Sequence, residues 1–148
     1  MLKVAIFPPN SLILSDLVER AGHEPLTIME KIAEKVRDVE IDSPPLNITA
    51  EEPSKGLRYA SAEAPSGVRG RLSVFGPLYE EADAIIALKD APMNFGCLGC
   101  ARTNEFLLYM IKKSGIPQIV LSYPKTEEEA RSVVSRILAF LKEVEGND

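Results

Sequence analysis

The sequence lacks any long apolar run, and this absence excludes a membrane-spanning helix. A helix that crosses a bilayer needs about 18 to 20 consecutive apolar residues, and no segment of the 148 residues approaches that length. Residues 1–7 are apolar, but they end at Pro8 and Pro9 and lack the small-residue cleavage site of a secretory signal. We therefore expect a cytoplasmic protein with no membrane partner, in which this run forms a strand.

The chain also lacks an excess of positive charge. Its formal net charge is −5 and its pI is near 5.0, which argues against nucleic acid as a partner. It contains no G-x-G-x-x-G sequence, no Walker loop and no G-x-S-x-G. These absences weaken a nucleotide-binding function and a hydrolase function.

Histidine and cysteine are scarce. His23 is the only histidine, so one chain cannot supply a conventional cluster of cysteine and histidine ligands. It follows Gly22, which is placed to end a helix, and we expect it at the surface. The two cysteines, Cys97 and Cys100, are too close in sequence for a useful structural disulfide. In a reducing compartment such a pair indicates redox or metal chemistry.

The sequence does contain the alternating strand and helix patterns of an α/β domain. Short apolar runs predict buried strands over residues 3–7, 24–28, 84–88 and 118–123. Helical spacing of apolar residues predicts helices after Ser11, over residues 102–113, and after a capping box of Thr126 and Glu129. We predict one domain over residues 1–148. Its fold is a three-layer α/β/α sandwich with a mostly parallel sheet of about four strands, flavodoxin-like or Rossmann-like.

The middle of the chain has a different composition. Residues 39–71 contain repeated prolines and glycines and few periodic apolar residues. Loops of this length are uncommon in compact domains and usually serve as lids or binding surfaces. We predict a long Pro-rich loop or lid here. A helix to about Arg37 would precede it, and a helix interrupted at Gly76 and Pro77 would follow it.

The C-x-x-C pair falls where a ligand would bind in such a fold. Ligands of open parallel sheets bind beyond the carboxyl ends of the strands, which here are residues 8–11, 90–100 and 123–124. The pair also lies just before the predicted helix that begins at Arg102. The positive end of a helix and a nearby guanidinium both favour the thiolate form of cysteine.

Three interpretations of this pair compete. Cys97 and Cys100 could form a dithiol/disulfide couple, with Cys97 as the catalytic nucleophile and Cys100 as the resolving thiol. They could instead be two ligands of a zinc ion or an iron–sulfur cluster that a second subunit completes, which would require a homodimer. The third interpretation is structural, because buried free cysteines are often small apolar residues that only pack.

Other polar residues are candidates for ligand binding. Arg69 and Arg71, in a glycine-containing segment, could grip a phosphate or a carboxylate together with Arg102. Asn10 and Ser11 could present backbone amides to an anion at a helix start. Each has a simpler interpretation, a solvated turn for the arginines and a helix cap for Asn10 and Ser11.

Five segments of this chain resemble one known family, methanogenesis marker protein 5. They are residues 7–11 (FPPNS), 20–26 (RAGHEPL), 41–49 (IDSPPLNIT), 65–71 (PSGVRGR) and 95–105 (FGCLGCARTNE). The resemblance spans almost the full chain, and the middle segment is its most distinctive part.

The resemblance implies an archaeal, strictly anaerobic setting and an accessory role in methanogenesis. The implied partner is methyl-coenzyme M reductase, or its nickel tetrapyrrole cofactor, which the protein would help to build, modify or activate. The family carries over no catalytic residues to this chain. Two alternatives stay open: a partner-binding module without chemistry, and an enzyme that acts on a small anionic metabolite.

Overall fold

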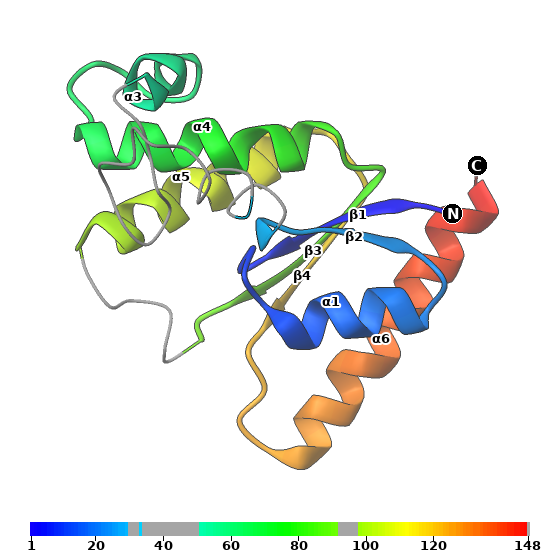
Figure 1. Ribbon diagram of the computed structural model, residues 1–148. Coiled ribbons are helices and arrows are strands. Elements are labelled where there is room, and N and C mark those ends of the chain that lie inside the picture. Colours follow the sequence, from blue (N-terminus) through cyan, green and yellow to red (C-terminus); the bar gives the residue numbers. More distant parts are fainter. Residues whose placement is uncertain (30–32, 34–50, 92–97, 148) are drawn as a thin grey trace.

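The centre of the molecule is a four-stranded sheet in which every neighbouring pair of strands is parallel (Figure 1). The computed structural model describes residues 1–29, 33, 51–91 and 98–147, and of residues 98–100 only the backbone. The strands are β1 (Lys3–Phe7), β2 (Glu24–Leu26), β3 (Ala84–Lys89) and β4 (Gln118–Ser122). Their order is β2-β1-β3-β4, which matches the first four strands of the flavodoxin-like order. The predicted fold class is confirmed.

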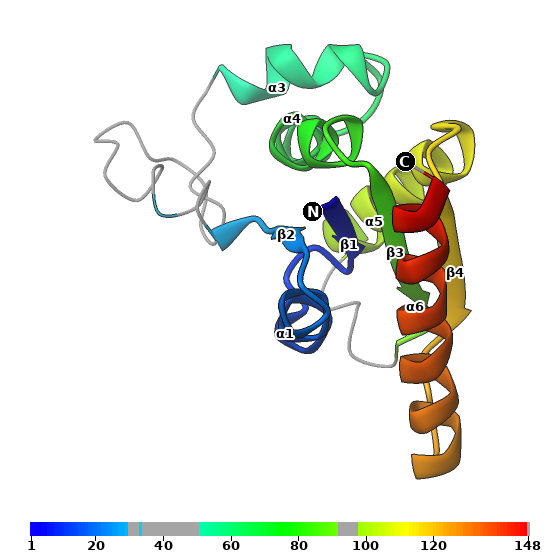
Figure 2. The same ribbon diagram turned by 90° about the vertical axis from the view of Figure 1, so that its right-hand side faces the viewer.

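Helices cover both faces of this sheet, because the side chains of each strand alternate between the two faces. Figures 1 and 2 show α4 (Ser66–Glu80) and α1 (Leu12–Arg20) on opposite sides of β1. Ala5, Phe7, Ile85 and Ala87 belong to the core on the side of α4 and of α5 (Leu98–Lys113). Val4, Ile6, Ile86 and Leu121 belong to the core on the side of α1 and of α6 (Glu127–Asn147). The side chains of each apolar run are therefore divided between two cores, one on each face of the sheet. Among the described residues, no helix has the length and apolarity required to cross a membrane.

Local signals define the ends of α1 and α6 as predicted. The Ser11 hydroxyl accepts a hydrogen bond from the Leu14 amide at 3.2 Å, which caps α1. Gly22 follows α1 with a φ of +87°, a conformation that residues with a side chain rarely adopt. At α6 the Thr126 hydroxyl accepts from the Glu129 amide at 3.2 Å. The Glu129 carboxylate accepts in turn from the Lys125 amide at 2.7 Å, one residue earlier than in the usual capping box.

The prediction of a loop over residues 39–71 is wrong for its C-terminal part, which contains helices. Residues 34–50 lie outside the described part, as does most of the helix predicted before them. After them come α3 (Glu52–Lys55) and a 3₁₀ turn, η1 (Gly56–Arg58), and α4 begins at Ser66. Gly56 of η1 packs directly on the backbone of Arg69 in α4, where a Cβ atom would overlap the carbonyl group. That tertiary contact left no periodic apolar pattern in the sequence.

The predicted interruption at Gly76 and Pro77 is wrong. α4 continues through both residues to Glu80. Gly76 is required for a different reason, because a Cβ atom there would overlap the ring of Tyr59. The missing side chain lets the segment after α3 pack closely onto α4.

Two buried polar side chains form hydrogen bonds with backbone groups at the two ends of β1. His23 is only 6% exposed, and its Nδ1 atom accepts a hydrogen bond from the Leu2 amide at 3.4 Å. The expectation that His23 lies at the surface is wrong, because the turn after Gly22 brings its side chain against β1. The buried Tyr79 hydroxyl donates to the Ile6 carbonyl at 2.8 Å. β2 ends beside Ala5, so it does not reach the Ile6 carbonyl. The Tyr79 hydroxyl gives this carbonyl the hydrogen bond that a longer β2 would have given.

Candidate functional site

The strand order creates one topological switch point, between β1 and β3. The chain leaves β1 toward α1 on one face and leaves β3 toward α5 on the other face. In open parallel sheets this divergence opens a crevice beyond the carboxyl ends of the two strands, where ligands bind. Figure 1 shows that α4 and α5 also begin on the side where β1 and β3 end. This side of the sheet, at the carboxyl ends of its strands, is the candidate functional site.

A small cavity of about 150 Å³ lies at the switch point. It is lined by Phe7 of β1, Lys89 and Asp90 at the end of β3, and Ala101, Asn104, Glu105 and Leu108 of α5. Ligand pockets usually span about 300–1,000 Å³, so this cavity fits a small molecule or one group of a larger one. Its lining is partly apolar and partly polar or charged, and the charged part is called the rim below.

The charges on the rim are of both signs. Lys89 supplies an ammonium group, and Asp90 and Glu105 supply carboxylates. Arg102 lies 3.8 Å from Glu105 in an ion pair that is largely exposed and therefore weak. Asp90 has a φ of +62°, in the left-handed region, which turns the chain sharply at the end of β3. The rim can offer a ligand both hydrogen-bond donors and acceptors.

The start of α5 brings the backbone of Cys100 to this site. α5 begins at Leu98, four residues earlier than predicted, so Cys100 is in its first turn instead of before it. Cys97 lies outside the described residues. The backbone of Cys100 adjoins Ala101, which lines the cavity.

The predicted polar residues are divided among three places. Asn10 and Ser11 line a separate cavity of about 390 Å³ beside α1 and β2, where the Ser11 hydroxyl already caps α1. Arg69 donates to the carbonyl oxygens of Ala64 at 3.1 Å and Pro53 at 2.8 Å, which ties α4 to α3. Arg71 is half-buried, with its Nη1 atom beside Gly67. Only Arg102 lies next to the cavity, and among the described lining residues there is no arginine.

Sequence reasoning missed Lys89, Asn104 and Glu105 and gave Asp90 little weight. A signal for all four was present. Lys89 and Asp90 directly follow the apolar run of β3, and Asn104 and Glu105 are four and five residues after Cys100, one turn further along α5. The carboxyl end of a central strand and the first turns of the next helix are where a doubly wound fold places ligand contacts.

The described residues do not complete a metal site. Among them there is no group of three or more histidine, cysteine, aspartate or glutamate side chains that could hold a metal ion. His23 packs against Leu2 at the amino ends of the strands, at the opposite edge of the sheet from α5's first turn. The two thiolates of a C-x-x-C supply half of the four ligands that zinc or an iron–sulfur cluster prefers. A metal at this pair would therefore need ligands beyond the two thiolates, and the described residues do not group to supply them.

A comparison of sequences identifies the relatives of this chain. A family described as "Uncharacterized protein conserved in archaea (DUF2112)" matches residues 2–144. The chain belongs to this archaeal family. Its similarity extends to the uncharacterized protein MJ0404 of Methanocaldococcus jannaschii, to which it is 57% identical over 147 residues, 99% of this chain and 98% of the relative. No solved structure matches the chain.

Proposed function

We propose that this archaeal protein is an accessory factor of methanogenesis that acts through the thiols of Cys97 and Cys100 at the switch point between β1 and β3. One observation carries the proposal: the cavity at the switch point is lined by Ala101, the residue that follows Cys100. A thiolate at the start of α5 would be stabilised by the helix dipole and by Arg102. A partner group seated in the cavity would then lie next to it.

The methanogenesis role rests on the resemblance to methanogenesis marker protein 5. Membership of a family conserved in archaea agrees with the archaeal setting that this resemblance implies, as does the relative from Methanocaldococcus jannaschii. The proposed partner is methyl-coenzyme M reductase during its maturation. At about 150 Å³ the cavity is too small for a whole tetrapyrrole, so the favoured target is a side chain of the partner or one substituent of its cofactor.

The thiol pair can act in two ways. As a dithiol/disulfide couple, Cys97 would attack a disulfide sulfur of the partner, and Cys100 would resolve the mixed disulfide, leaving the partner reduced and the pair oxidised. As half of a zinc or iron–sulfur site, the pair would be shared with a second chain, in a homodimer or in the complex with the partner. In both cases Arg102, which lies beside the cavity, would bind the partner or a small anionic ligand near the thiols.

Thiol reactivity and metal content test the proposal. Protein purified without oxygen is analysed for zinc and iron, and its alkylation rate is followed as a function of pH. The matched control is the Cys97→Ser/Cys100→Ser double variant with Ser135→Cys, because residue 135 is exposed in the middle of α6. We expect at least one native thiol to react at a pH well below that of the control thiol. Equal pH profiles and no metal would contradict a chemical role of the pair.

The pathway is tested separately. Deletion of the gene in a methane-producing archaeon is expected to lower the specific activity of methyl-coenzyme M reductase, and the wild-type chain should restore it. The double cysteine variant should not. Full restoration by that variant would favour the partner-binding module, and unchanged enzyme activity in the deletion strain would rule out the maturation role.

A second function has one observation in its favour. Lys89 and Asn104 line the cavity beside Arg102, and these donors suit the carboxylate or phosphate of a small metabolite. An enzyme on such a substrate would not need the thiols. Binding of small anions that weakens in Lys89→Ala but not in the double cysteine variant would favour this alternative.

A further inference from the structure

The outer edge of β4 presents unpaired backbone groups. Pro117 accepts a hydrogen bond from Ile85, and the Tyr123 amide donates to Lys89, so the odd-numbered residues of this strand face β3. Backbone groups alternate in direction along a strand, and the N–H and C=O groups of Gln118, Val120 and Ser122 therefore point away from the sheet. Among the described elements, none pairs with this edge.

Within the strand, this edge lacks the charges and prolines that usually prevent association. Natural edge strands carry charged residues, prolines or bulges that prevent pairing with another chain. β4 is a regular strand of five residues without a charge or a proline. Its central residue, Val120, is 44% exposed, and Tyr123 just beyond its end is 40% exposed. Apolar surface of this kind beside free backbone groups is suited to a strand from another chain.

Two grooves of opposite charge flank the edge. The groove at the carboxyl half of β4, about 570 Å³, is lined by three cations, Lys89, Lys125 and Arg136, and one acid, Glu129. The groove at the amino half, about 620 Å³, is lined by two acids, Asp83 and Glu143, and no cation among the described residues. A half-turn about an axis through Val120 exchanges the two halves, so each groove of one copy would meet the oppositely charged groove of another.

We propose that two copies of this chain associate through β4, paired antiparallel about a two-fold axis at Val120. Val120 would face Val120 of the second copy, and Gln118 would face Ser122 at both ends. Each of these three pairs has its backbone groups directed outward, so each can exchange two hydrogen bonds. The two four-stranded sheets would join into one continuous sheet.

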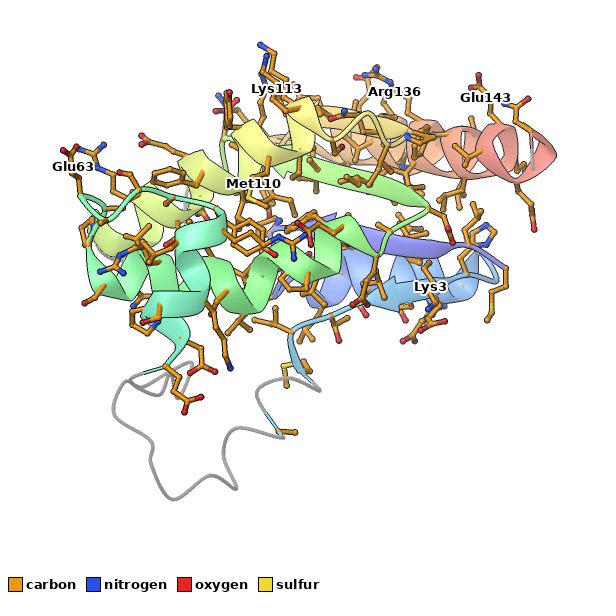
Figure 3. All side chains as sticks on the ribbon, turned by 90° about the horizontal axis from the view of Figure 1, so that it is seen from above. Lys3, Glu63, Met110, Lys113, Arg136 and Glu143 are labelled. Atoms are coloured by element: carbon orange, nitrogen blue, oxygen red, sulfur yellow. The ribbon has the colours of Figure 1, made fainter. Side chains whose placement is uncertain are left out.

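The same rotation aligns complementary charges on α6. Arg136 and Glu143 are two helical turns apart, and Figure 3 shows both pointing outward from the same side of the molecule as Lys113. Arg136 lies in the groove with Val120 and Ser122, and Glu143 in the groove with Gln118. In the dimer Arg136 of each copy therefore faces Glu143 of the other.

The dimer has a consequence for the thiol pair. Antiparallel pairing of β4 places the carboxyl ends of the two sheets at opposite ends of the assembly, and with them the two starts of α5. The two C-x-x-C pairs could not then share one metal ion within this dimer. Any four-thiolate site would require a different partner chain.

A substitution at the centre of the edge tests the interface. Val120→Lys places two ammonium groups opposite each other, and we expect it to raise the dimer dissociation constant by about a hundredfold or more. Because Val120 is half-exposed, the monomer should keep its fold, which circular dichroism checks. The matched control is Leu57→Lys, at a similarly exposed apolar residue of η1, which is not part of the sheet. Oligomeric state is measured by analytical ultracentrifugation over a wide range of concentration.

A charge exchange on α6 tests the register. Arg136→Glu and Glu143→Arg, each alone, should raise the dissociation constant about tenfold, because each places like charges together at two symmetric contacts. The double variant should return it to within about threefold of the wild-type value. A wild-type chain that stays monomeric, or a dimer that Val120→Lys leaves intact, would overturn the proposal. A dimer sensitive to Val120→Lys but with no recovery in the double variant would overturn the two-fold register.

Discussion

The two outer strands of the sheet are built in opposite ways. β2 has three residues, Glu24 to Leu26, and β4 has five without a charge or a proline. The Glu24 amide donates to the Leu2 carbonyl, so Glu24 directs its backbone groups toward β1. The next residue, Pro25, therefore directs its backbone outward, and at this outward position it has no N–H group to offer another strand. β2 thus ends the sheet with a charge, a proline and little length, the usual means of blocking association. β4 has none of these features.

The difference shows where each edge obtains its stability. Beyond the end of β2 the chain itself supplies the missing hydrogen bond, from Tyr79 to the Ile6 carbonyl. At β4 the outward groups of Gln118, Val120 and Ser122 remain for water or for a second chain. The sheet is therefore completed at Ile6 within the monomer, whereas the outward groups of β4 would find strand partners only in the proposed dimer.

The largest expected effect comes from proline on the inner side of β4. Leu121 is buried, and its backbone groups face β3. Leu121→Pro removes a ladder hydrogen bond and should lower the free energy of unfolding by about 3 kcal/mol or more. The matched variant is Val120→Pro, which copies the outward proline of β2. It should cost the monomer about 1 kcal/mol or less and abolish pairing between copies.

Urea denaturation and analytical ultracentrifugation of these two proline variants measure both effects. Equal destabilisation by the two prolines would show that the alternation of inward and outward groups along β4 is wrong. A dimeric Val120→Pro variant would show that β4 does not form the interface.

A smaller loss is expected at the completed edge. Tyr79→Phe leaves the Ile6 carbonyl buried without its partner and should lower the free energy of unfolding by about 1–2 kcal/mol. The control is Tyr109→Phe on α5, where the ring is 61% exposed and the loss should be close to zero. Thermal and urea denaturation measure both variants. A neutral Tyr79→Phe would contradict the role assigned to this hydroxyl at the end of β2.

The same tyrosine predicts a dependence of stability on alkaline pH. Burial raises the pKa of Tyr79 well above its ordinary value of 10.0. The folded state therefore holds the phenolic proton more tightly than the unfolded state does. Stability from this group is fully present below pH 10 and is lost as pH rises above it, by up to about 1.4 kcal/mol per pH unit.

The measurement is the free energy of unfolding between pH 9 and 11 for the wild type and for Tyr79→Phe. The wild-type slope should be steeper. The pKa of Tyr59 is also raised, by burial and by Glu80 against an opposing effect of Arg58, so the variant should keep a shallower slope. Parallel curves would contradict the assignment to Tyr79.

The smallest losses in the free energy of unfolding are expected at the caps of α1 and α6, the helices next to the outer strands β2 and β4. Ser11 caps α1, next to β2, in a partly buried setting, and Ser11→Ala should cost about 1 kcal/mol. Thr126 caps the exposed start of α6, which follows β4, and Thr126→Ala should cost about 0.5 kcal/mol. Thermal denaturation compares the two. A larger loss at Thr126 would mean that the start of α6 is more constrained than its exposure indicates, as burial in a dimer would cause.

Much of the fold followed from local patterns. The apolar run at residues 3–7 became β1 without change, and the capping signals at Ser11 and Thr126 began helices where expected. The switch-point edge was predicted because strand ends in a parallel sheet share one side. The residues on that edge were predicted less well. Arg69 has the composition of an anion-binding residue, but its guanidinium is held by two backbone carbonyls of its own chain.

Periodicity and capping are short-range properties, so local patterns were enough to predict the four strands, the helices α1, α5 and α6, and the starts of α1 and α6. The tertiary structure alone decided the rest. It placed β3 beside β1, buried His23 against Leu2 and joined Tyr79 to Ile6, residues 73 positions apart. It also left β4 on the outside with its outward groups free. These features depend on which distant segments meet, because a backbone group is satisfied or left open only by the neighbour that the whole fold provides.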